Sequence, residues 1–367
     1  MSQRLEVLYN RKPCYDIVIE QDFNNLINEI NRLDYSNKKI CVITDSIVAS
    51  IYKDELLNIL EPTCKNLVFY SFPSGEEQKN LSTVNSIYSY LIENQFDRKD
   101  ALIALGGGVV GDITGFVAAT YLRGIDYIQV PTTLLSQVDS SIGGKTGVDY
   151  ENYKNMIGAF KMPKLVYINI HTLTTLDDRQ FYNGFAEAMK HGLIKDAMYY
   201  EWLLSNMYEI CDRELEVLEE LVYRSCQIKK IVVEKDPLEQ GDRAILNFGH
   251  TIGHAIEKYK NFSFMHGECV ALGCVAAAYI SWKKNLLSME EYYEVRDMFV
   301  PFNLPITIED LNIDEIIQIT KSDKKMEQDT LKFILLKKIG KAVIDRTVTI
   351  EELKAGIEEI IYIDELD

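Results

Sequence analysis

The sequence predicts an α/β N-terminal domain with a parallel sheet, followed by a mostly α-helical C-terminal domain. Short apolar runs alternate with helical patterns through the first half of the chain. From about Asp178 onward, helical spacing predominates. A chain of 367 residues also exceeds one ordinary hydrophobic core. We therefore expect two domains, covering residues 1–177 and 178–367.

Five apolar runs in the first half are expected to be strands. Uninterrupted apolar runs separated by helices are typical of a parallel sheet covered on both faces. The strands are expected at 39–45, 66–70, 100–105, 127–131 and 165–169, with helical patterns at 46–60 and 81–93. In the second half, helices are expected near 179–195, 213–235, 248–259, 268–285 and 288–298, and a hairpin at 331–336 and 342–344.

Composition excludes several classes of protein. The formal net charge is −17 and no basic tract is present, which argues against binding nucleic acid or an anionic membrane. The longest uncharged run, from Cys269 to Trp282, is too short to span a bilayer. Seven cysteines without a C-x-x-C pair fit reduced thiols, so we expect a cytoplasmic protein. The composition is compatible with a small anionic substrate, provided that cations are concentrated where it binds.

A glycine-rich turn follows the third expected strand. Gly106, Gly108 and Gly111 match G-x-G-x-x-G, in which backbone N–H groups can approach a pyrophosphate at a helix N-terminus. The motif alone is weak, and a tight packing turn is the alternative. It also lies two strands later than in the usual fingerprint, and no acid ends the next strand. We therefore predict a nucleotide-binding loop outside the standard Rossmann register.

Three of the five histidines fall within residues 250–266. His250 and His254 are one helical turn apart on one face, and His266 could approach from the next helix. The H-E-x-x-H pattern is absent because Thr251 occupies the glutamate position. Buried, hydrogen-bonded histidines are the alternative, but a cluster favours a metal site. Glu187 is the obvious carboxylate to complete it.

Several cations lie in settings unlike a solvated surface. Lys190 is three residues after Glu187 on an expected helix, so the two share a face. Lys145 lies in a second glycine-rich loop that resembles the end of a P-loop, but the spacing is wrong for ATP. Lys229 and Arg243 precede the histidines.

Taken together, these blocks resemble the 3-dehydroquinate synthase family. The similarity is carried, in order, by 106–112, 121–124, 131–135, 137–141, 143–147, 154–160, 186–190, 246–254 and 266–268. It implies conversion of 3-deoxy-D-arabino-heptulosonate 7-phosphate into 3-dehydroquinate and phosphate in the shikimate pathway. The implied steps are transient NAD-dependent oxidation, phosphate elimination, reduction and intramolecular aldol cyclisation. The implied cofactors are NAD and a divalent metal, usually Zn²⁺ with Co²⁺ as an alternative, in a homodimer.

The resemblance also assigns roles to residues. The implied metal ligands are Glu187, His250 and His266. The implied substrate and catalytic residues are Arg123, Asp139, Lys145, Asn155, Lys190, Lys229, Arg243, Asn247 and His254. The implied NAD contacts are Asp45, Glu76, Lys79, Gly107, Gly108, Val109, Asp112, Thr132, Thr133, Lys145, Lys154 and Thr175. One of Lys324 and Lys325 would also contact substrate, and Arg123 would reach the neighbouring subunit's substrate phosphate.

Spacing and resemblance differ over His254. Helical spacing alone makes it a metal ligand, whereas the resemblance makes it a second-sphere or acid–base residue, and we follow the resemblance. Alternative functions are another sugar-phosphate cyclase of the superfamily, a metal-dependent polyol dehydrogenase, or a regulatory protein that binds metal and NAD without catalysis. The intact loop at 143–147 argues against the first alternative, the many cations against the second, and the complete motif set against the third.

Overall fold

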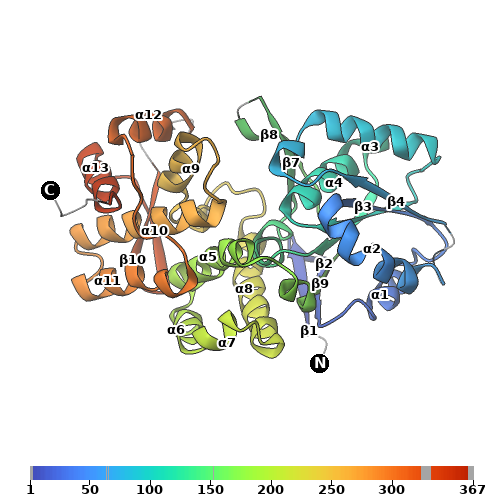
Figure 1. Cartoon of the computed structure of the whole chain (residues 1–367), viewed down its shortest axis with the longest axis horizontal. Coiled ribbons are helices and arrows are strands. Elements are labelled where there is room, and N and C mark those ends of the chain that lie inside the picture. Colours follow the sequence, from blue (N-terminus) through green and yellow to red (C-terminus); the bar gives the residue numbers. More distant parts are fainter. Residues whose placement is uncertain (1–2, 63, 65, 152, 324–331, 363–367) are drawn as a thin grey trace. The chain divides into compact units, whose positions relative to one another are not determined.

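A computed structural model of the chain describes residues 3–62, 64, 66–151, 153–323 and 332–362. The chain divides into two compact units (Figure 1). The first comprises Met1–Leu176 and Leu218–Leu238, and the second Asp177–Val217 and Glu239–Asp367. An α/β first unit and a helical second unit agree with the expected fold class.

The first unit contains a seven-stranded sheet in the order β1-β2-β9-β6-β5-β3-β4. All neighbours are parallel except β1 and β2, which pair antiparallel. The strands are β1 (Gln3–Tyr9), β2 (Lys12–Glu20), β3 (Lys39–Asp45), β4 (Asn66–Phe72), β5 (Ala101–Gly106), β6 (Asp126–Pro131) and β9 (Leu165–Asn169). The five expected strands are thus confirmed, and β1 and β2 are added to them.

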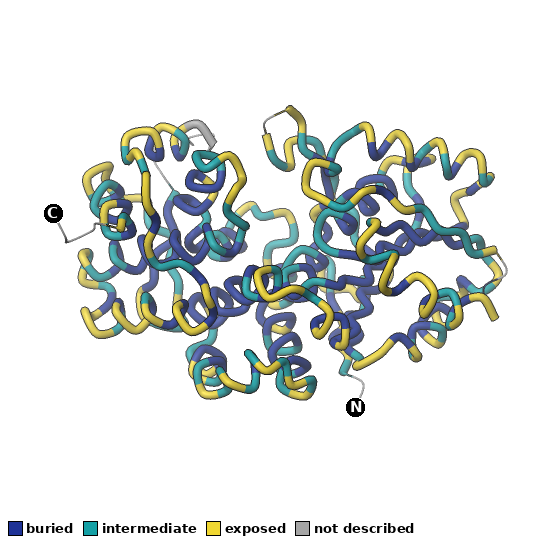
Figure 2. The backbone as a smooth tube through the Cα atoms, viewed as in Figure 1, coloured by how far each residue is buried: buried dark blue, intermediate teal, exposed yellow. Residues whose placement is uncertain are grey.

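Alternate strand residues face opposite layers of helices, because side chains alternate along a strand. Ile40 and Val42 pack on one face with α1 (Leu26–Arg32) and α2 (Ser46–Leu60). Cys41 and Ile43 pack on the other face with α3 (Leu81–Glu93) and α4 (Gly108–Thr120). The central strands are buried along their length (Figure 2).

A separate hairpin, β7 (Lys145–Tyr150) and β8 (Tyr153–Phe160), follows β6 and carries Lys145, Lys154 and Asn155. Short helical turns complete the connections. They are η1 (Glu76–Gln78), η2 (Tyr121–Arg123), η3 (Ser136–Ser140), η4 (Ile170–Thr174), η5 (Asp242–Asn247) and η6 (Val300–Phe302).

Helix α8 (Leu215–Lys235) belongs mainly to the first unit although the chain has already entered the second. Four hydrogen bonds explain this. Glu219 accepts hydrogen bonds from Gln3 and Gln21, Glu234 accepts one from the backbone N–H of Leu8, and the Cys226 thiol donates to the carbonyl of Gln137. The expected boundary between 177 and 178 lies one residue from the first break, but it does not anticipate this return.

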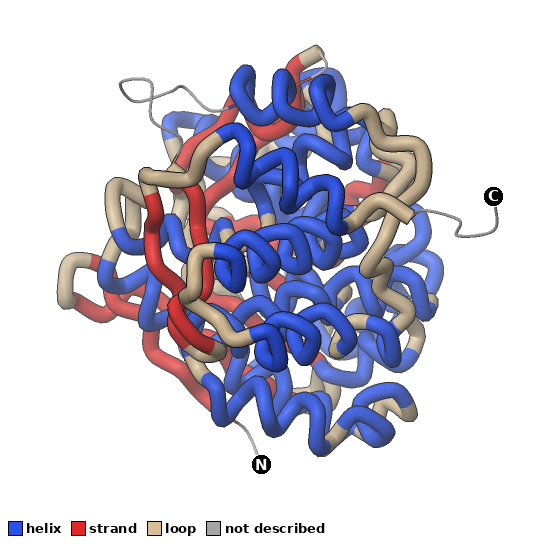
Figure 3. Tube along the Cα trace, turned by 90° about the vertical axis from the view of Figure 1, so that its left-hand side faces the viewer, coloured by secondary structure: helices blue, strands red, loops and turns tan. Residues whose placement is uncertain are grey.

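Helices dominate the second unit (Figure 3). They are α5 (Asp178–Lys195), α6 (Ala197–Ser205), α7 (Met207–Cys211), α9 (His250–Tyr259), α10 (His266–Lys283), α11 (Met289–Asp297), α12 (Ile313–Asp323) and α13 (Ile350–Glu359). The expected hairpin is β10 (Phe333–Lys338) and β11 (Lys341–Asp345), with Gly340 at positive φ in its turn. Lys324 and Lys325 lie outside the described residues. None of the described helices combines the length and apolar character needed to cross a membrane.

Candidate active site

Helix α5 carries a buried carboxylate, Glu187, whose two oxygens have different surroundings. Oε2 accepts a hydrogen bond from Lys190 one turn later, so the two side chains share a face as the sequence predicts. Oε1 is buried and has no hydrogen-bond partner among the described residues. A buried oxygen without a hydrogen-bond partner is costly in free energy. Oε1 is therefore expected to bind a partner that the described residues do not supply.

Two histidines direct their Nε2 atoms at this oxygen. His250 Nε2 and His266 Nε2 each lie 3.6 Å from Glu187 Oε1. His250 is the first residue of α9, and the preceding Gly249 has φ +79°, where a Cβ would lie 2.6 Å from Cys274 Sγ. Only glycine fits that turn without strain. His266 is the first residue of α10, so each ring projects from a helix N-terminus.

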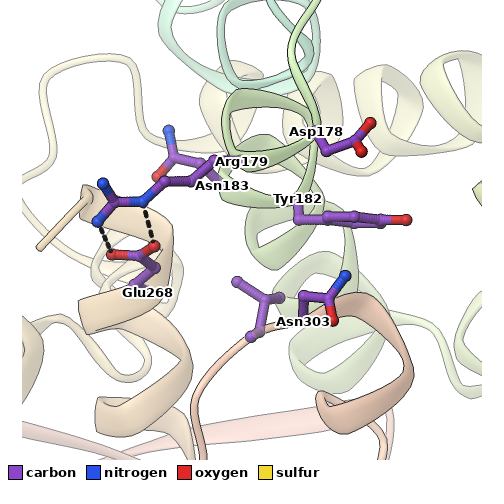
Figure 4. A pocket seen from close by; sticks show the side chains of 7 residues that line it. Asp178, Arg179, Tyr182, Asn183, Glu268 and Asn303 are labelled. Atoms are coloured by element: carbon purple, nitrogen blue, oxygen red, sulfur yellow. Dashed lines mark hydrogen bonds and ion pairs between the residues drawn. The ribbon is translucent and has the colours of Figure 1, made fainter.

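The start of α10 is hydrogen-bonded to α5 about one and two turns before Glu187. Asn183 Oδ1 accepts a hydrogen bond of 2.5 Å from the backbone N–H of Gly267. Arg179 donates to both carboxylate oxygens of Glu268, at 2.7 and 2.8 Å, as Figure 4 shows. Glu268 also accepts from the Met265 N–H at 2.8 Å, which caps the helix. These contacts fix the height of His266 relative to Glu187.

His254 joins the same cluster. Its ring centroid lies 5.0 Å from that of His250 and 5.6 Å from that of His266. One ligand atom from each of the three histidines lies within 4.8 Å of the others. The structure therefore brings together both sets considered from the sequence: the three imidazoles, and Glu187 with His250 and His266.

The electrostatics separate the roles of these groups. Burial alone would raise the pKa of Glu187, but Lys190, His266 and His250 hold it well below its usual value. Burial, together with the Lys190 charge, lowers the pKa of His250 well below 6.5. Burial would also lower the pKa of His266, but the neighbouring carboxylates of Glu187 and Glu257 raise it to about 9. A charged carboxylate thus faces one neutral and one protonated imidazole.

The predicted nucleotide loop lies at the carboxyl end of β5. Gly107 precedes α4 and no described side chain caps that helix N-terminus. A Cβ on Gly107 would lie 3.1 Å from Thr133 Cγ2, and one on Gly108 would lie 3.2 Å from Ser140 Oγ. β5 pairs with β3 where the strand order changes direction, which is the usual ligand-binding position in such sheets. The turn therefore leaves backbone N–H groups accessible to a phosphate.

A buried lysine links this turn to the hairpin. Lys79 Nζ lies 2.7 Å from Asp112 Oδ2 on α4 and donates to Asn155 Oδ1 on β8 at 2.7 Å. Burial alone would lower the pKa of Lys79, but Asp112 and Glu76 raise it. Lys154 lies 3.5 Å from Glu76. The predicted residues Glu76, Lys79, Asp112, Lys154 and Asn155 therefore form one polar cluster.

A second ion pair in the first unit joins η3 to α8. Lys229 Nζ lies 2.5 Å from both the carbonyl oxygen and Oδ1 of Asp139. The lysine is almost fully buried, whereas the aspartate is partly exposed. This pairing holds an ammonium group at a fixed position beside a carboxylate that substrate could reach.

The other predicted residues have more ordinary settings. Asp45 caps α2 by accepting from two backbone N–H groups, and Thr175 bonds to Tyr52. Thr132 Oγ1 is buried with no partner among the described residues, while Thr133 bonds to Ser136. Arg243 is buried, Val109 is half-buried, and Arg123 and Lys145 are exposed.

Two carboxylates were missed by the sequence analysis. Glu239 accepts a hydrogen bond of 2.8 Å from the predicted residue Asn247. Glu257 is buried on α9, and its Oε2 lies 3.8 Å from His266 Nδ1. Glu257 follows His250 by seven residues, so helical spacing places both on one face and is the signal that could have identified it. For Glu239 we find no comparable signal.

Solved structures with this fold include enzymes that bind both NAD and a metal. The 2-epi-5-epi-valiolone synthase ValA from Streptomyces hygroscopicus subsp. jinggangensis, with NAD⁺ and Zn²⁺ bound, is 26% identical, with a TM-score of 0.88 over 97% of this chain and 99% of that one. A 2-deoxy-scyllo-inosose synthase complexed with carbaglucose-6-phosphate, NAD⁺ and Co²⁺ is 25% identical, with a TM-score of 0.86 over 98% and 100%. The fold is that of the sugar-phosphate cyclases.

Sequence comparison narrows the class. Residues 69–183 match the family described as 3-dehydroquinate synthase N-terminal, and residues 184–326 match 3-dehydroquinate synthase C-terminal. The 3-dehydroquinate synthase of Acetivibrio thermocellus is 44% identical over 92% of this chain and 94% of that protein. That of Streptococcus thermophilus is 41% identical over 97% and 100%. The chain belongs to the 3-dehydroquinate synthase family.

Proposed function

We propose that this protein converts 3-deoxy-D-arabino-heptulosonate 7-phosphate into 3-dehydroquinate and phosphate, as its family implies. One observation carries the assignment beyond family membership: the buried, unpartnered Oε1 of Glu187 faces the Nε2 atoms of His250 and His266 at 3.6 Å. A divalent cation is the partner that one carboxylate and two imidazoles fit. Glu187, His250 and His266 would hold Zn²⁺, or Co²⁺ in its place.

NAD is the second proposed cofactor. The uncapped N-terminus of α4, the side-chain-free positions Gly107 and Gly108, and the unpaired Oγ1 of Thr132 support it. When bound, NAD would take up and return a hydride, while the metal would lower the pKa of substrate hydroxyls. The other proposed NAD contacts are Asp45, Glu76, Lys79, Val109, Asp112, Thr133, Lys145, Lys154 and Thr175.

The chain's own cations would bind the substrate. A sugar acid phosphate carries two anionic groups, which explains buried Lys190, Lys229 and Arg243 in a chain of net charge −17. Each of the two lysines already has a carboxylate beside it, so its ammonium is held in place before substrate arrives. We assign substrate contacts also to Asp139, Lys145, Asn155 and Asn247.

His254 would act as an acid–base residue. Its ring centroid lies 5.0 Å from that of His250, which would hold the cation. An imidazole can accept or return a proton near neutral pH. This role distinguishes it from the two proposed histidine ligands, although spacing alone favours a third ligand.

We also propose a cytoplasmic homodimer, in which Arg123 reaches the partner's substrate phosphate. Arg123 is exposed and all seven cysteines are free thiols, which is compatible with this proposal. Sedimentation would test the dimer. An Arg123→Ala variant should lose activity yet regain part of it when mixed with a variant inactivated at Lys229, because mixed dimers contain one intact site.

The function is tested by incubating the purified protein with NAD, Zn²⁺ and the heptulosonate phosphate. We expect equal amounts of phosphate and dehydroquinate, with no net NADH. A reaction that instead oxidises polyols and accumulates NADH would favour a polyol dehydrogenase. If the protein binds metal and NAD but converts no substrate, the result would favour a regulatory protein without catalytic activity.

A further inference from the structure

The ring of His266 is approached by carboxylates on both of its nitrogens. Nε2 lies 3.6 Å from Glu187 Oε1, and Nδ1 lies 3.8 Å from Glu257 Oε2. The ring of His250 has a parallel arrangement: Nε2 faces Glu187, and Nδ1 lies 3.1 Å from the carbonyl oxygen of Phe248. An oxygen therefore lies near Nδ1 of each imidazole, at hydrogen-bond distance for His250 and at ion-pair distance for His266, and both Nε2 atoms face the Glu187 carboxylate.

This arrangement bears on which nitrogen carries the proton. A neutral imidazole has a single N–H, and it can ligate a metal only through the nitrogen that lacks it. An acceptor at Nδ1 keeps the proton there and leaves the Nε2 lone pair for the metal. For His250 the acceptor is a backbone carbonyl, which no side-chain substitution removes. For His266 it is a side chain.

We propose that Glu257 is a positioning residue for the metal site: its carboxylate accepts the Nδ1 proton of His266 and so presents Nε2 as the ligand atom. The proposal rests on the metal site of the proposed function. It adds a residue that touches neither substrate nor metal and acts only through the His266 ring.

The setting of Glu257 supports this role. Its side chain is only 6% exposed, and α9 carries it two turns beyond His250 on the same face. Burial of a carboxylate is costly unless hydrogen bonds or opposite charge compensate it. The His266 ring is one partner that compensates the buried charge.

The test measures Zn²⁺ affinity of the metal-stripped protein by competition with a chromophoric chelator. Glu257→Ala should weaken binding by roughly 10- to 100-fold, the usual effect of removing such a partner. Glu257→Gln should weaken it less, because the amide oxygen still accepts the Nδ1 proton. Co²⁺ absorption should change in the alanine variant, since the ligand geometry loosens.

Glu219→Gln is the matched control. Glu219 is also a buried helical glutamate, but it accepts hydrogen bonds from Gln3 and Gln21 in the first unit. Its substitution should lower stability without changing Zn²⁺ affinity. Wild-type Zn²⁺ affinity in Glu257→Ala would overturn the proposal. If the alanine variant does not fold, Glu257→Met decides, because methionine fills a similar volume without a carboxylate oxygen: wild-type affinity and an unchanged Co²⁺ spectrum in that variant would overturn the proposal.

Because the readout is metal binding, failure of the proposed function is distinguishable from failure of this inference. A protein that binds Zn²⁺ through Glu257-dependent ligands but releases no phosphate would contradict the cyclase assignment alone. Conversely, an active cyclase whose Glu257→Ala variant keeps full Zn²⁺ affinity would contradict the inference alone.

Discussion

Lys190 donates a hydrogen bond to Glu187 from one turn further along the same buried helix, and both side chains are almost fully removed from solvent. The pair leaves one carboxylate oxygen for the two histidines. A buried ion pair contributes little by itself, but removing one partner leaves an uncompensated charge. The pair therefore makes a specific prediction about stability.

Lys190→Met should destabilise the metal-free protein by roughly 3–5 kcal/mol, because Glu187 then carries a buried charge without its ammonium partner. Zn²⁺ should recover much of this loss, since a bound cation compensates the same carboxylate. Denaturant unfolding with and without Zn²⁺ measures both effects. A metal-free stability within about 1 kcal/mol of wild type would contradict this reading of the pair.

His250→Ala should abolish tight Zn²⁺ binding while NAD binding persists, because the nucleotide loop belongs to the other unit. His254→Ala should keep the metal and lose activity. Metal analysis after dialysis separates the two variants. Loss of zinc in His254→Ala would favour the three-histidine set over the carboxylate set, whereas full zinc content in His250→Ala would contradict both sets.

Zn²⁺ binding should depend steeply on pH through His266. In the metal-free protein its pKa is raised from 6.5 to about 9, so the ring is protonated at pH 7 and the metal must displace that proton. Affinity should therefore increase by about tenfold per pH unit between pH 7 and 8.5. Calorimetry in buffers of different ionisation heat should detect about one released proton.

The same shift has a consequence for the metal-free fold. A raised pKa means that protonation of His266 stabilises the folded state, fully below about pH 6.5. That contribution is lost as pH rises through about 9. Thermal unfolding of wild type and His266→Gln should converge at high pH. A difference between the two melting temperatures that stays constant from pH 6 to 9.5 would contradict this contribution of His266.

Gly107→Ala should weaken NAD binding by roughly tenfold or more, because the new methyl would lie 3.1 Å from Thr133 Cγ2 beside the helix N-terminus. Zn²⁺ affinity should stay unchanged. Fluorescence titration with NADH gives the first quantity and chelator competition the second. Unaltered NADH affinity would remove the glycine turn from the proposed cofactor site.

Local patterns in the sequence were sufficient for most elements. Continuous apolar runs such as the one at 100–105 correctly predicted central strands, here Ala101–Gly106, and three-residue spacing correctly placed Glu187 and Lys190 on one helix face. Both predictions depend only on residues that are close together in the sequence. The antiparallel start, β1 and β2, was not predicted, although Leu5 and Val7 alternate with polar residues in a strand-like pattern.

Features that depend on packing between residues far apart in the sequence could not be predicted from local patterns. The return of α8 to the first unit depends on Glu219 and Glu234 meeting residues more than 190 positions away. Glu257 can be connected with the metal site only because His266, which begins a different helix, lies close to it. Helical periodicity places a residue on a face but does not say what that face meets.

The central claim is tested most directly by a coupled assay on the metal-loaded protein with NAD and 3-deoxy-D-arabino-heptulosonate 7-phosphate. We predict that phosphate and 3-dehydroquinate appear in equal amounts, that chelation stops the reaction and that Zn²⁺ restores it. Absence of both products from protein shown to contain metal and NAD would contradict the account.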